Sequence, residues 1–202
     1  LYHGFMTEIR QRLEEVGFRL HVIDTDKESE IRQYEAEFCY LQIRYVCELI
    51  SLAVLAVNQP LSDQRELIRK WHAGDILDRL SRSNQHCFPI PVKKNINPDG
   101  SIHFDRPPGR FMNMSDLKSV YKICGEALHR GVLRHALNGR PKVYEPGRIK
   151  FWKMEFTKLL SEHMVLVPGP DKVFLVNLFG GPAGEVAVYE AVSEAPGYVY
   201  EP

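Results

Sequence analysis

Apolar residues recur at alternating spacings of three and four over the first 25 residues. They fall at Met6, Ile9, Leu13, Val16, Leu20 and Ile23. This spacing places the side chains on one face of an α-helix, so it predicts a long amphipathic helix. Gly17 is the weak point, and the alternative is a break there, with Phe18, Leu20 and Val22 forming one face of a strand. The sustained spacing favours a single helix.

A second long helix is expected after a short turn. Asp24, Thr25 and Asp26 are candidates for its N-cap. Glu28 and Glu30 add negative charge near the positive end of its dipole. Its apolar seam repeats the same alternation through Ile31, Tyr34, Phe38, Leu41, Tyr45, Glu48, Leu52 and Leu55. Two long helices joined by a short turn pack antiparallel, so residues 6–57 predict a helical hairpin.

The next segments predict a third helix and a small flap. The helix would begin after Pro60 with Ser62 as its cap and reach about Ser83. Its apolar face would be Leu67, Ile68, Trp71, Ile76, Leu77 and Leu80. Residues 84–113 are rich in proline, and Asn97-Pro98-Asp99-Gly100 is typical of a turn. We therefore expect residues 92–96 and 101–104 to pair as a β-hairpin.

Two more helices and three strands complete the chain. Ser115 with Asp116 opens a fourth helix that would end near Asn138-Gly139, and residues 148–163 predict a fifth. The period then changes to short β-branched runs at 164–167, 172–178 and 185–192. Turn-forming residues separate these runs, which predicts a three-stranded antiparallel meander.

These elements define an α+β protein that is mainly α. The expected architecture is a helical bundle built on the long antiparallel hairpin, with a small flap hairpin and a C-terminal three-stranded antiparallel β-meander. Residues 1–163 would form the bundle, with the flap inserted at 84–113. Residues 164–194 would form the meander packed on the bundle, and residues 195–202 a loose tail.

Composition and charge narrow the possible functions. Hydrophobic residues make up 44% of the chain and charged residues 26%, which is ordinary for a folded soluble protein. Lys+Arg and Asp+Glu are both 26, so the formal net charge is zero. Proteins that bind duplex nucleic acid usually carry a basic excess. The zero net charge therefore argues against general binding of nucleic acid, and only binding through a local basic patch is compatible with it.

The four cysteines favour a reducing compartment. They form no C-x-x-C pair, and Cys39 and Cys47 would lie roughly 12 Å apart on one helix, too far for a disulfide. We expect reduced thiols and a cytoplasmic location. The apolar stretch at residues 49–57 is too short to span a bilayer, so no membrane partner is expected.

Arg44 and Glu48 are the first candidates for chemistry. They lie four residues apart within a narrow polar stripe of a helix that is otherwise apolar nearly all round. Because Glu48 falls within the apolar seam, we expect the pair to be partly buried. One interpretation is an ion pair that holds helices in register, and the other is a functional site.

A second candidate lies in the fourth helix, in the run Gly125-Glu126-Ala127-Leu128-His129-Arg130-Gly131. Glycine inside a helix costs about 1 kcal/mol relative to alanine, so close approach of another helix or a ligand should compensate. His129 lies one turn beyond Gly125, over the gap that the glycine leaves. It would reach Glu48 or Tyr45 if the helices pack together, either as a core histidine or as an acid–base group.

Together these segments resemble a known group of helical proteins. The residues that carry the resemblance are Leu41-Gln42-Ile43-Arg44, Cys47-Glu48-Leu49-Ile50 and the run from Cys124 to Gly131. They look like a family of uncharacterised bacterial proteins and, more distantly, like HEPN-type domains. The resemblance covers about residues 6–139 and not the C-terminal sheet. It implies a helical bundle that dimerises, and many HEPN-type domains are ribonucleases or accessory subunits of defence and toxin systems.

The resemblance also implies site residues. HEPN nucleases carry an arginine followed a few residues later by a histidine, and two protomers bring these to a dimer groove that cleaves RNA. Two spans of this chain fit that spacing, Arg130 to His135 and Arg79 to His86. On this reading Arg130 and His135, or Arg44, Glu48 and His129, would be the active groups.

The remaining candidates concern nucleic acid and metal. Arg148, Lys150, Trp152 and Lys153 combine positive charge with a stacking surface, as a helix face over core aromatics or as a nucleic-acid contact. His72, His86, Cys87 and His103 lack the spacing of a zinc site, so no metal is expected. No nucleotide-binding glycine motif is present, and no cofactor is expected.

Two hypotheses of function follow. The first is a non-catalytic interaction module that dimerises or docks on a protein partner through its long helices. The second is a HEPN-type RNA-binding protein or metal-independent ribonuclease.

Overall fold

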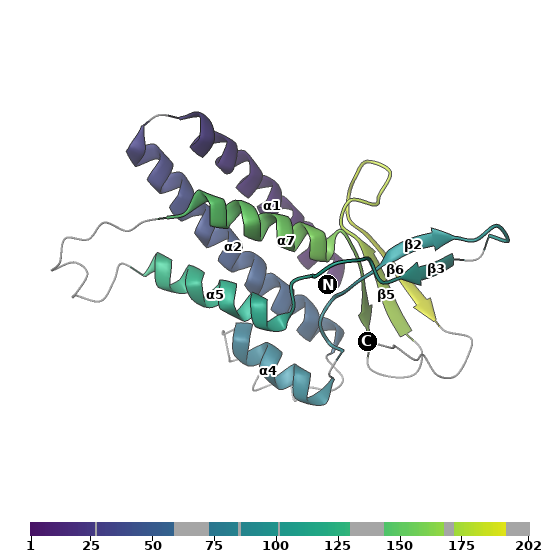
Figure 1. Ribbon diagram of the computed structural model, residues 1–202. Helices are drawn as coiled ribbons and strands as arrows, with labels where there is room; N and C mark the ends of the chain where they lie inside the picture. Colours follow the sequence, from purple (N-terminus) through teal and green to yellow (C-terminus); the bar gives the residue numbers. More distant parts are fainter. Residues whose placement is uncertain are drawn as a thin grey trace.

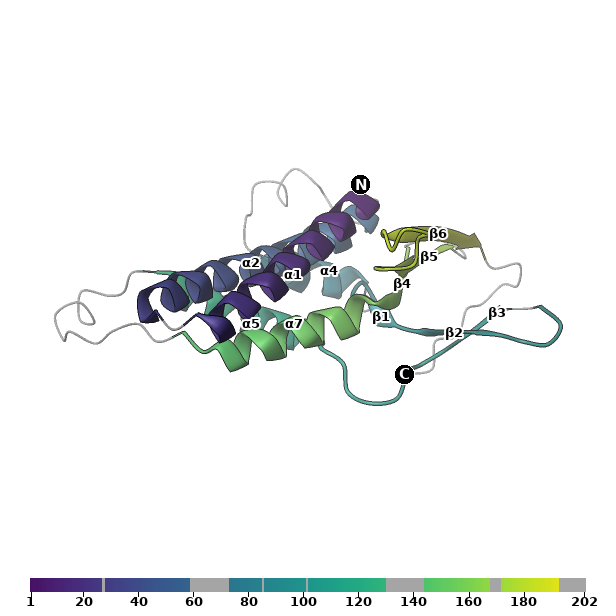
Figure 2. The ribbon, with the colours of Figure 1, turned by 90° about the horizontal axis from the view of Figure 1, so that it is seen from above.

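The computed structural model describes residues 1–26, 28–58, 73–84, 86–100, 102–129, 144–167 and 172–192. Over these ranges the fold is α+β and mainly α, as predicted from the sequence. The helices lie together as an elongated bundle, and two antiparallel sheets project from one end of it (Figures 1 and 2).

The predicted hairpin is formed by α1 (Tyr2–Thr25) and α2 (Ser29–Val57), which pack along each other's length (Figure 1). All six residues of the predicted α1 seam are buried. The helix is continuous through Gly17, so the alternative of a strand there is wrong. A Cβ atom at Gly17 would lie 2.9 Å from Cε of Lys153, so the glycine makes room for a lysine of another helix.

The turn between α1 and α2 differs from the expectation. α1 runs to Thr25 and has Asp26 as its C-cap, and α2 is preceded by Glu28. The Asp26 side chain accepts a hydrogen bond from the backbone N–H of Glu28 at 2.8 Å. The residues proposed as N-caps of α2 therefore end α1 and shape the turn.

The predicted seam of α2 is wrong. The buried residues centre on Ala36, Cys39, Tyr40, Ile43, Val46, Cys47, Ile50, Ala53, Val54 and Val57, and Gln42, Leu49 and Ser51 beside them are buried as well. The eight residues from Ile31 to Leu55 that were expected to face the core lie on the opposite side, exposed or half-buried, and only Leu52 and Leu55 of them pack against the core. Both sides of α2 are apolar, so periodicity alone does not distinguish them. We call these eight residues the α2 stripe.

Three shorter helices complete the described bundle: α4 (Ala73–Ser83), α5 (Met114–Leu128) and α7 (Pro146–Leu160). α4 ends where the third helix was predicted to end, whereas its proposed start lies outside the described residues. α5 begins at Met114, with Asn113 as its N-cap, and not at Ser115. The Asn113 side chain accepts the backbone N–H of Asp116, and Asp116 accepts that of Asn113 in return. This capping box fixes the start of α5.

The predicted meander is confirmed, with one strand added. β4 (Glu162–Leu166), β5 (Lys172–Asn177) and β6 (Ala187–Val192) pair antiparallel in sequence. β1 (Ile90–Pro91) pairs with β4 and gives the order β1-β4-β5-β6. Its two residues carry no strand pattern. Residues 90–91, within the segment assigned to the flap, thus belong to the main sheet.

The flap is also confirmed. β2 (Lys93–Ile96) and β3 (Ile102–Asp105) form a separate two-stranded antiparallel sheet around the predicted turn. Gly100 has φ 85°, a conformation that glycine adopts without strain. The proposed tail at 195–202 lies outside the described residues.

One face of the four-stranded sheet packs on the helices. His163, Val165 and Val176 point to this face and are buried. His163 Nε2 lies 2.8 Å from the hydroxyl of Tyr2 on α1, and its Nδ1 lies 3.0 Å from the carbonyl oxygen of Leu160. Since that carbonyl can only accept, Nδ1 carries the proton and Nε2 accepts from Tyr2. The inner face therefore joins the helical core through a satisfied buried histidine.

All four cysteines are free and buried. Burial raises the pKa of the Cys39 and Cys124 thiols to about 12 and that of Cys87 to about 11. The pKa of Cys47 is raised for the same reason. The thiols are therefore protonated at neutral pH.

The segment Glu30–Val57 of α2 is long and apolar enough to cross a membrane, with a mean hydropathy of 1.6 in its most apolar window. Core helices of soluble proteins pass the same test, and 61% of this window is buried. The sequence-based view that only residues 49–57 are membrane-like was therefore too narrow.

Candidate functional site

Arg44 and Glu48 form an ion pair on α2, as expected from their spacing. Arg44 Nε lies 3.3 Å from Glu48 Oε1, with about a quarter of the arginine side chain and a third of the glutamate side chain exposed. Arg44 Nη2 also donates to the hydroxyl of Tyr121 on α5 at 2.8 Å. The guanidinium carbon lies 4.3 Å from the centre of the Tyr121 ring, a cation–π geometry.

Tyr121 completes this group. Burial raises the pKa of its hydroxyl, the nearby charge of Arg44 opposes that change, and the negative charge of Glu48 adds to it. The neutral hydroxyl accepts from Arg44, which also pairs with Glu48. We call Arg44, Glu48 and Tyr121 the α2–α5 cluster. Each member has partners within the cluster, which is the arrangement of a cross-link between helices.

Gly125 makes this cluster possible. A Cβ atom at position 125 would lie 2.5 Å from Arg44 Nη1, far inside van der Waals contact. The expectation that Gly125 permits close approach of a group from another helix is therefore confirmed. The group is the guanidinium of Arg44 and not the imidazole of His129.

His129 does not join the cluster. α5 ends at Leu128, and His129 is its C-cap with φ −66° and ψ 126°, outside the helical region. The helical wheel that placed its side chain over Gly125 does not apply beyond the last helical residue. His129 is exposed, and within the described residues no hydrogen bond or ion pair links its side chain to Glu48 or Tyr45. Arg44 and Glu48 therefore meet as predicted, but the prediction that His129 joins them is wrong.

The HEPN-type pairs are placed only in part. Arg130 and His135 lie outside the described residues, as do the proposed end of the fourth helix and His72. Arg79 lies on α4, and His86 is exposed beyond the end of that helix.

The proposed nucleic-acid residues do not form one free cationic surface. Arg148 pairs with Glu145 at 3.0 Å, and Lys150 pairs with Asp24 at 2.8 Å. Trp152 is buried and packs edge-on against Tyr40. The Lys153 side chain lies against Gly17. The two ion pairs neutralise the local charge, and the indole is not available for stacking with a base.

Metal ligation has no candidate in the described part of the chain. Over those ranges, no group of three or more His, Cys, Asp or Glu side chains is arranged to hold an ion.

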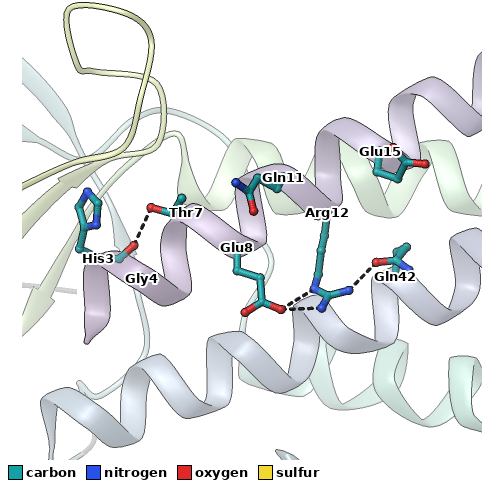
Figure 3. Close-up of a pocket in the computed structure, with 8 residues that line it drawn as sticks. All are labelled: His3, Gly4, Thr7, Glu8, Gln11, Arg12, Glu15 and Gln42. Atoms are coloured by element: carbon teal, nitrogen blue, oxygen red, sulfur yellow. Dashed lines mark hydrogen bonds and ion pairs between the residues drawn. The ribbon is translucent and has the colours of Figure 1, made fainter.

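A shallow groove runs between α1 and α2 (Figure 3). Figure 3 shows Arg12 at its centre, bound to Glu8 on α1 and to Gln42 on α2. The Arg12–Gln42 bond is 2.6 Å long. The guanidinium of Arg12 also lies 4.6 Å from the centre of the Tyr45 ring, and that of Arg19 lies 5.1 Å from the Phe38 ring. A polar wall of α1 therefore borders the α2 stripe along one side.

A deeper cleft of about 440 Å³ lies between the flap and the outer face of the sheet. Val92, Lys94, Ile102 and Phe104 of the flap segment line one wall. The other wall is lined by Glu162, Leu175, Asn177 and Tyr189, together with His163, Val176 and Gly180. None of these residues was proposed from the sequence. The available signal was the alternation of polar and apolar residues in the second predicted flap strand, residues 101–104.

No family model matches this chain, and neither a curated protein nor a solved structure matches it. The geometry of the α2 stripe, the α2–α5 cluster and the flap cleft is therefore the basis for assigning function.

Proposed function

We propose that this protein is a non-catalytic interaction module that self-associates through the α2 stripe. The observation that carries the proposal is the exposure of apolar side chains on the longest helix. Tyr34 is 67% exposed, Tyr45 37% and Ile31 36%, and among these three the Tyr45 ring is partly covered by the Arg12 guanidinium of α1. An apolar surface of this extent on a single helix is typical of a protein–protein interface.

The spacing of the stripe indicates the kind of partner. Its eight positions alternate by three and four residues, which is the a/d pattern of a coiled-coil seam. This pattern binds another helix along its length. Seven of the eight positions are apolar, and the exception is Glu48.

A second copy of the chain is the partner that fits this seam. In an antiparallel pair, Leu41 of one copy would lie opposite Tyr45 of the other, and Tyr34 opposite Leu52. All eight positions then find a counterpart in the same stripe, as a two-fold interface requires. The formal net charge of zero leaves no overall repulsion between two copies.

The stripe alone is smaller than a stable interface, which uses about 20–30 residues on each side. The polar wall of α1 would supply the rim. Glu8, Arg12 and Glu15 lie beside the stripe, and their charges are already paired or hydrogen-bonded in one copy. They add little desolvation cost, because rim groups stay in contact with water.

Sedimentation velocity on the full chain tests this proposal, with Tyr34→Lys as the variant. Tyr34 is mostly exposed, so the substitution should leave the fold unchanged while it places a charge in the seam. We expect a dimer for the natural sequence and a monomer for Tyr34→Lys. Met154→Lys is the matched control, because Met154 is 55% exposed on α7 and lies outside the stripe. It should remain dimeric.

A natural sequence that is monomeric at high micromolar concentration contradicts the proposal. So does a dimer that Tyr34→Lys and Met154→Lys weaken equally. Circular dichroism of each variant shows whether it is folded.

The ribonuclease hypothesis has a separate test. It requires that His135→Ala abolish cleavage of RNA while the protein stays folded. The interaction module requires that the natural sequence cleave no RNA, with or without divalent metals. Neither result depends on the oligomeric state found for Tyr34→Lys.

A further inference from the structure

The flap is amphipathic, and its apolar side faces the sheet. In the β2–β3 register Lys94 lies opposite Phe104, and Ile96 lies opposite Ile102, so these four share one face. Lys94, Ile102 and Phe104 line the cleft, as does Val92 just before β2. Asn95, His103 and Asp105 lie on the other face, where Asn95 and His103 both bind Asp105.

The outer face of the sheet supplies the opposite wall. Glu162, Leu175, Asn177 and Tyr189 share this face, because Glu162 pairs with Asn177 and Leu175 pairs with Tyr189 in the strand register. Their neighbours in sequence point inward to the helices. The flap and the sheet project together from one end of the bundle (Figures 1 and 2).

The cleft has the size and lining of a small-ligand site. Its volume of about 440 Å³ falls in the range of about 300–1,000 Å³ that such pockets occupy. Large apolar side chains lie at its mouth, where Ile102 is 52% exposed and Tyr189 is 60% exposed. A ligand that filled the cleft would remove them from water.

Glu162 is the distinctive polar group of the cleft. Its side chain is half-buried, and Oε2 accepts the backbone N–H of Lys94 at 3.2 Å. Its own backbone carbonyl accepts the N–H of Val92 at 3.0 Å, so both contacts hold the root of the flap. No lysine, arginine or histidine of the described residues lies within ion-pair distance of this carboxylate. A partly desolvated carboxylate without a counter-ion favours a cation.

Two aromatic rings strengthen that preference. Phe104 on the flap and Tyr189 on β6 face the cleft from opposite walls. A carboxylate together with aromatic faces is the combination that binds ammonium and guanidinium groups, since each contributes attraction to positive charge. The apolar walls of Val92, Ile102 and Leu175 select a cation attached to an apolar body.

We infer that the cleft between the flap and the outer face of the sheet binds an organic cation, an ammonium or guanidinium group carried on an apolar body. Glu162 pairs with the charge, and Phe104 and Tyr189 enclose the apolar part. The ligand is a free amine or the side chain of a lysine or arginine in a peptide, and both present the same chemistry. This site is separate from the α2 stripe, and the inference does not rest on self-association.

The test is a titration of the isotope-labelled full chain followed by NMR, with three probes of similar shape. 2-Phenylethylamine carries a positive charge, 2-phenylethanol is neutral and 3-phenylpropanoate is negative. We expect the amine to bind at least about tenfold more tightly than the other two, with shifts confined to the flap, β5 and β6. A capped peptide with one lysine between two leucines, compared with its norleucine analogue, forms a second arm. Tighter binding of the lysine peptide than of the amine would identify a peptide as the source.

Glu162→Gln tests the assigned residue. Glutamine retains an oxygen that can accept the Lys94 N–H, so the flap root keeps its hydrogen bond. The variant should bind the amine no better than the alcohol. Glu190→Gln is the matched control, because Glu190 lies on β6 opposite Phe174 and points to the other face of the sheet. It should bind the amine like the natural sequence.

Lys94→Gln provides a test that does not alter Glu162. Lys94 is exposed and its ammonium repels a cation in the cleft, so its removal should tighten amine binding by about threefold. The inference is overturned if the amine and the alcohol bind equally, if Glu162→Gln leaves amine binding unchanged, or if none of the probes binds.

Discussion

Two glycines on different helices each leave room for a basic side chain from a neighbouring helix. Gly17 on α1 accommodates Lys153 of α7, and Gly125 on α5 accommodates Arg44 of α2. A glycine inside a helix lowers its stability by roughly 1 kcal/mol relative to alanine. At both positions the contact with the neighbouring helix offsets that cost. A larger residue in place of either glycine would occupy the space that the Lys153 or Arg44 side chain now fills.

Gly125→Ala should lower the free energy of unfolding by about 1–2 kcal/mol, although alanine is the better helix former. The new methyl group displaces the guanidinium of Arg44 and separates it from Tyr121. Urea denaturation measures the change. Gly4→Ala is the control, since nothing lies within 4 Å of its Cβ position, and it should raise stability slightly.

A double-mutant cycle identifies the cause. In an Arg44→Ala background, Gly125→Ala should become neutral or stabilising, because the displaced group is gone. An equal loss of stability in both backgrounds would show that Arg44 is not responsible.

At the scale of elements, α1 and α2 show where hydrophobic periodicity is sufficient and where it is not. The outer face of α1 carries charged residues such as Glu8, Arg12 and Glu15, so its apolar spacing identified the buried face correctly. α2 is apolar on both sides, and the same rule selected the α2 stripe instead of the core face. The element was predictable from sequence, but the side that it buries depends on its neighbours.

Helix ends limited the prediction of the candidate site. Arg44 and Glu48 were identified because residues four apart on a helix are neighbours, and Gly125 because a glycine inside a helix indicates a close contact. Tyr121 was missed as a partner, since its contact joins two helices that are far apart in sequence. His129 was misplaced because α5 ends before it, and no residue in that run marks the end clearly. The flap cleft depends on how a hairpin and a sheet are oriented, which local patterns do not contain.

Asn113→Ala should lower the free energy of unfolding by about 1 kcal/mol, because it removes one half of the capping box of α5. Asp116 keeps its own half of the box, because it accepts the backbone N–H of residue 113, which alanine retains. Differential scanning calorimetry measures the loss. Ser119→Ala on the same helix is the control and should have a smaller effect, because the Ser119 hydroxyl binds a carbonyl within its own helix. Equal effects would contradict a role for the cap.

At the scale of the whole molecule, the inner face of the sheet and the bundle are joined by a buried polar contact. Tyr2 on α1 donates to His163 on β4, and the Tyr2 ring also lies 6.3 Å from the Phe174 ring. Burial lowers the pKa of His163 to about 4, so the imidazole is neutral in the folded protein at neutral pH. The stability of the molecule should therefore depend on pH through this residue.

The direction of this pH dependence follows from the protonation of His163 in the folded and unfolded states. An unfolded histidine takes up a proton below about pH 6.5, while folded His163 stays neutral until about pH 4. The stabilising contribution is therefore complete above pH 6.5 and falls by roughly 3 kcal/mol as the pH decreases to 4. His163→Gln removes it, so the difference in free energy of unfolding between natural sequence and variant should shrink over this range. Exposed His103→Gln is the control. A difference that is independent of pH would contradict the assignment.

The four buried thiols give the molecule internal reporters of its own motion. An alkylating reagent attacks the thiolate, which is scarce at Cys39, Cys87 and Cys124 in the closed structure. Labelling of the folded protein must then proceed through transient opening, and its rate measures how often each region opens. Cys87, between α4 and the root of the flap, would time the opening of that end of the bundle. Cys47, in the middle of α2, would be labelled only when the whole core separates.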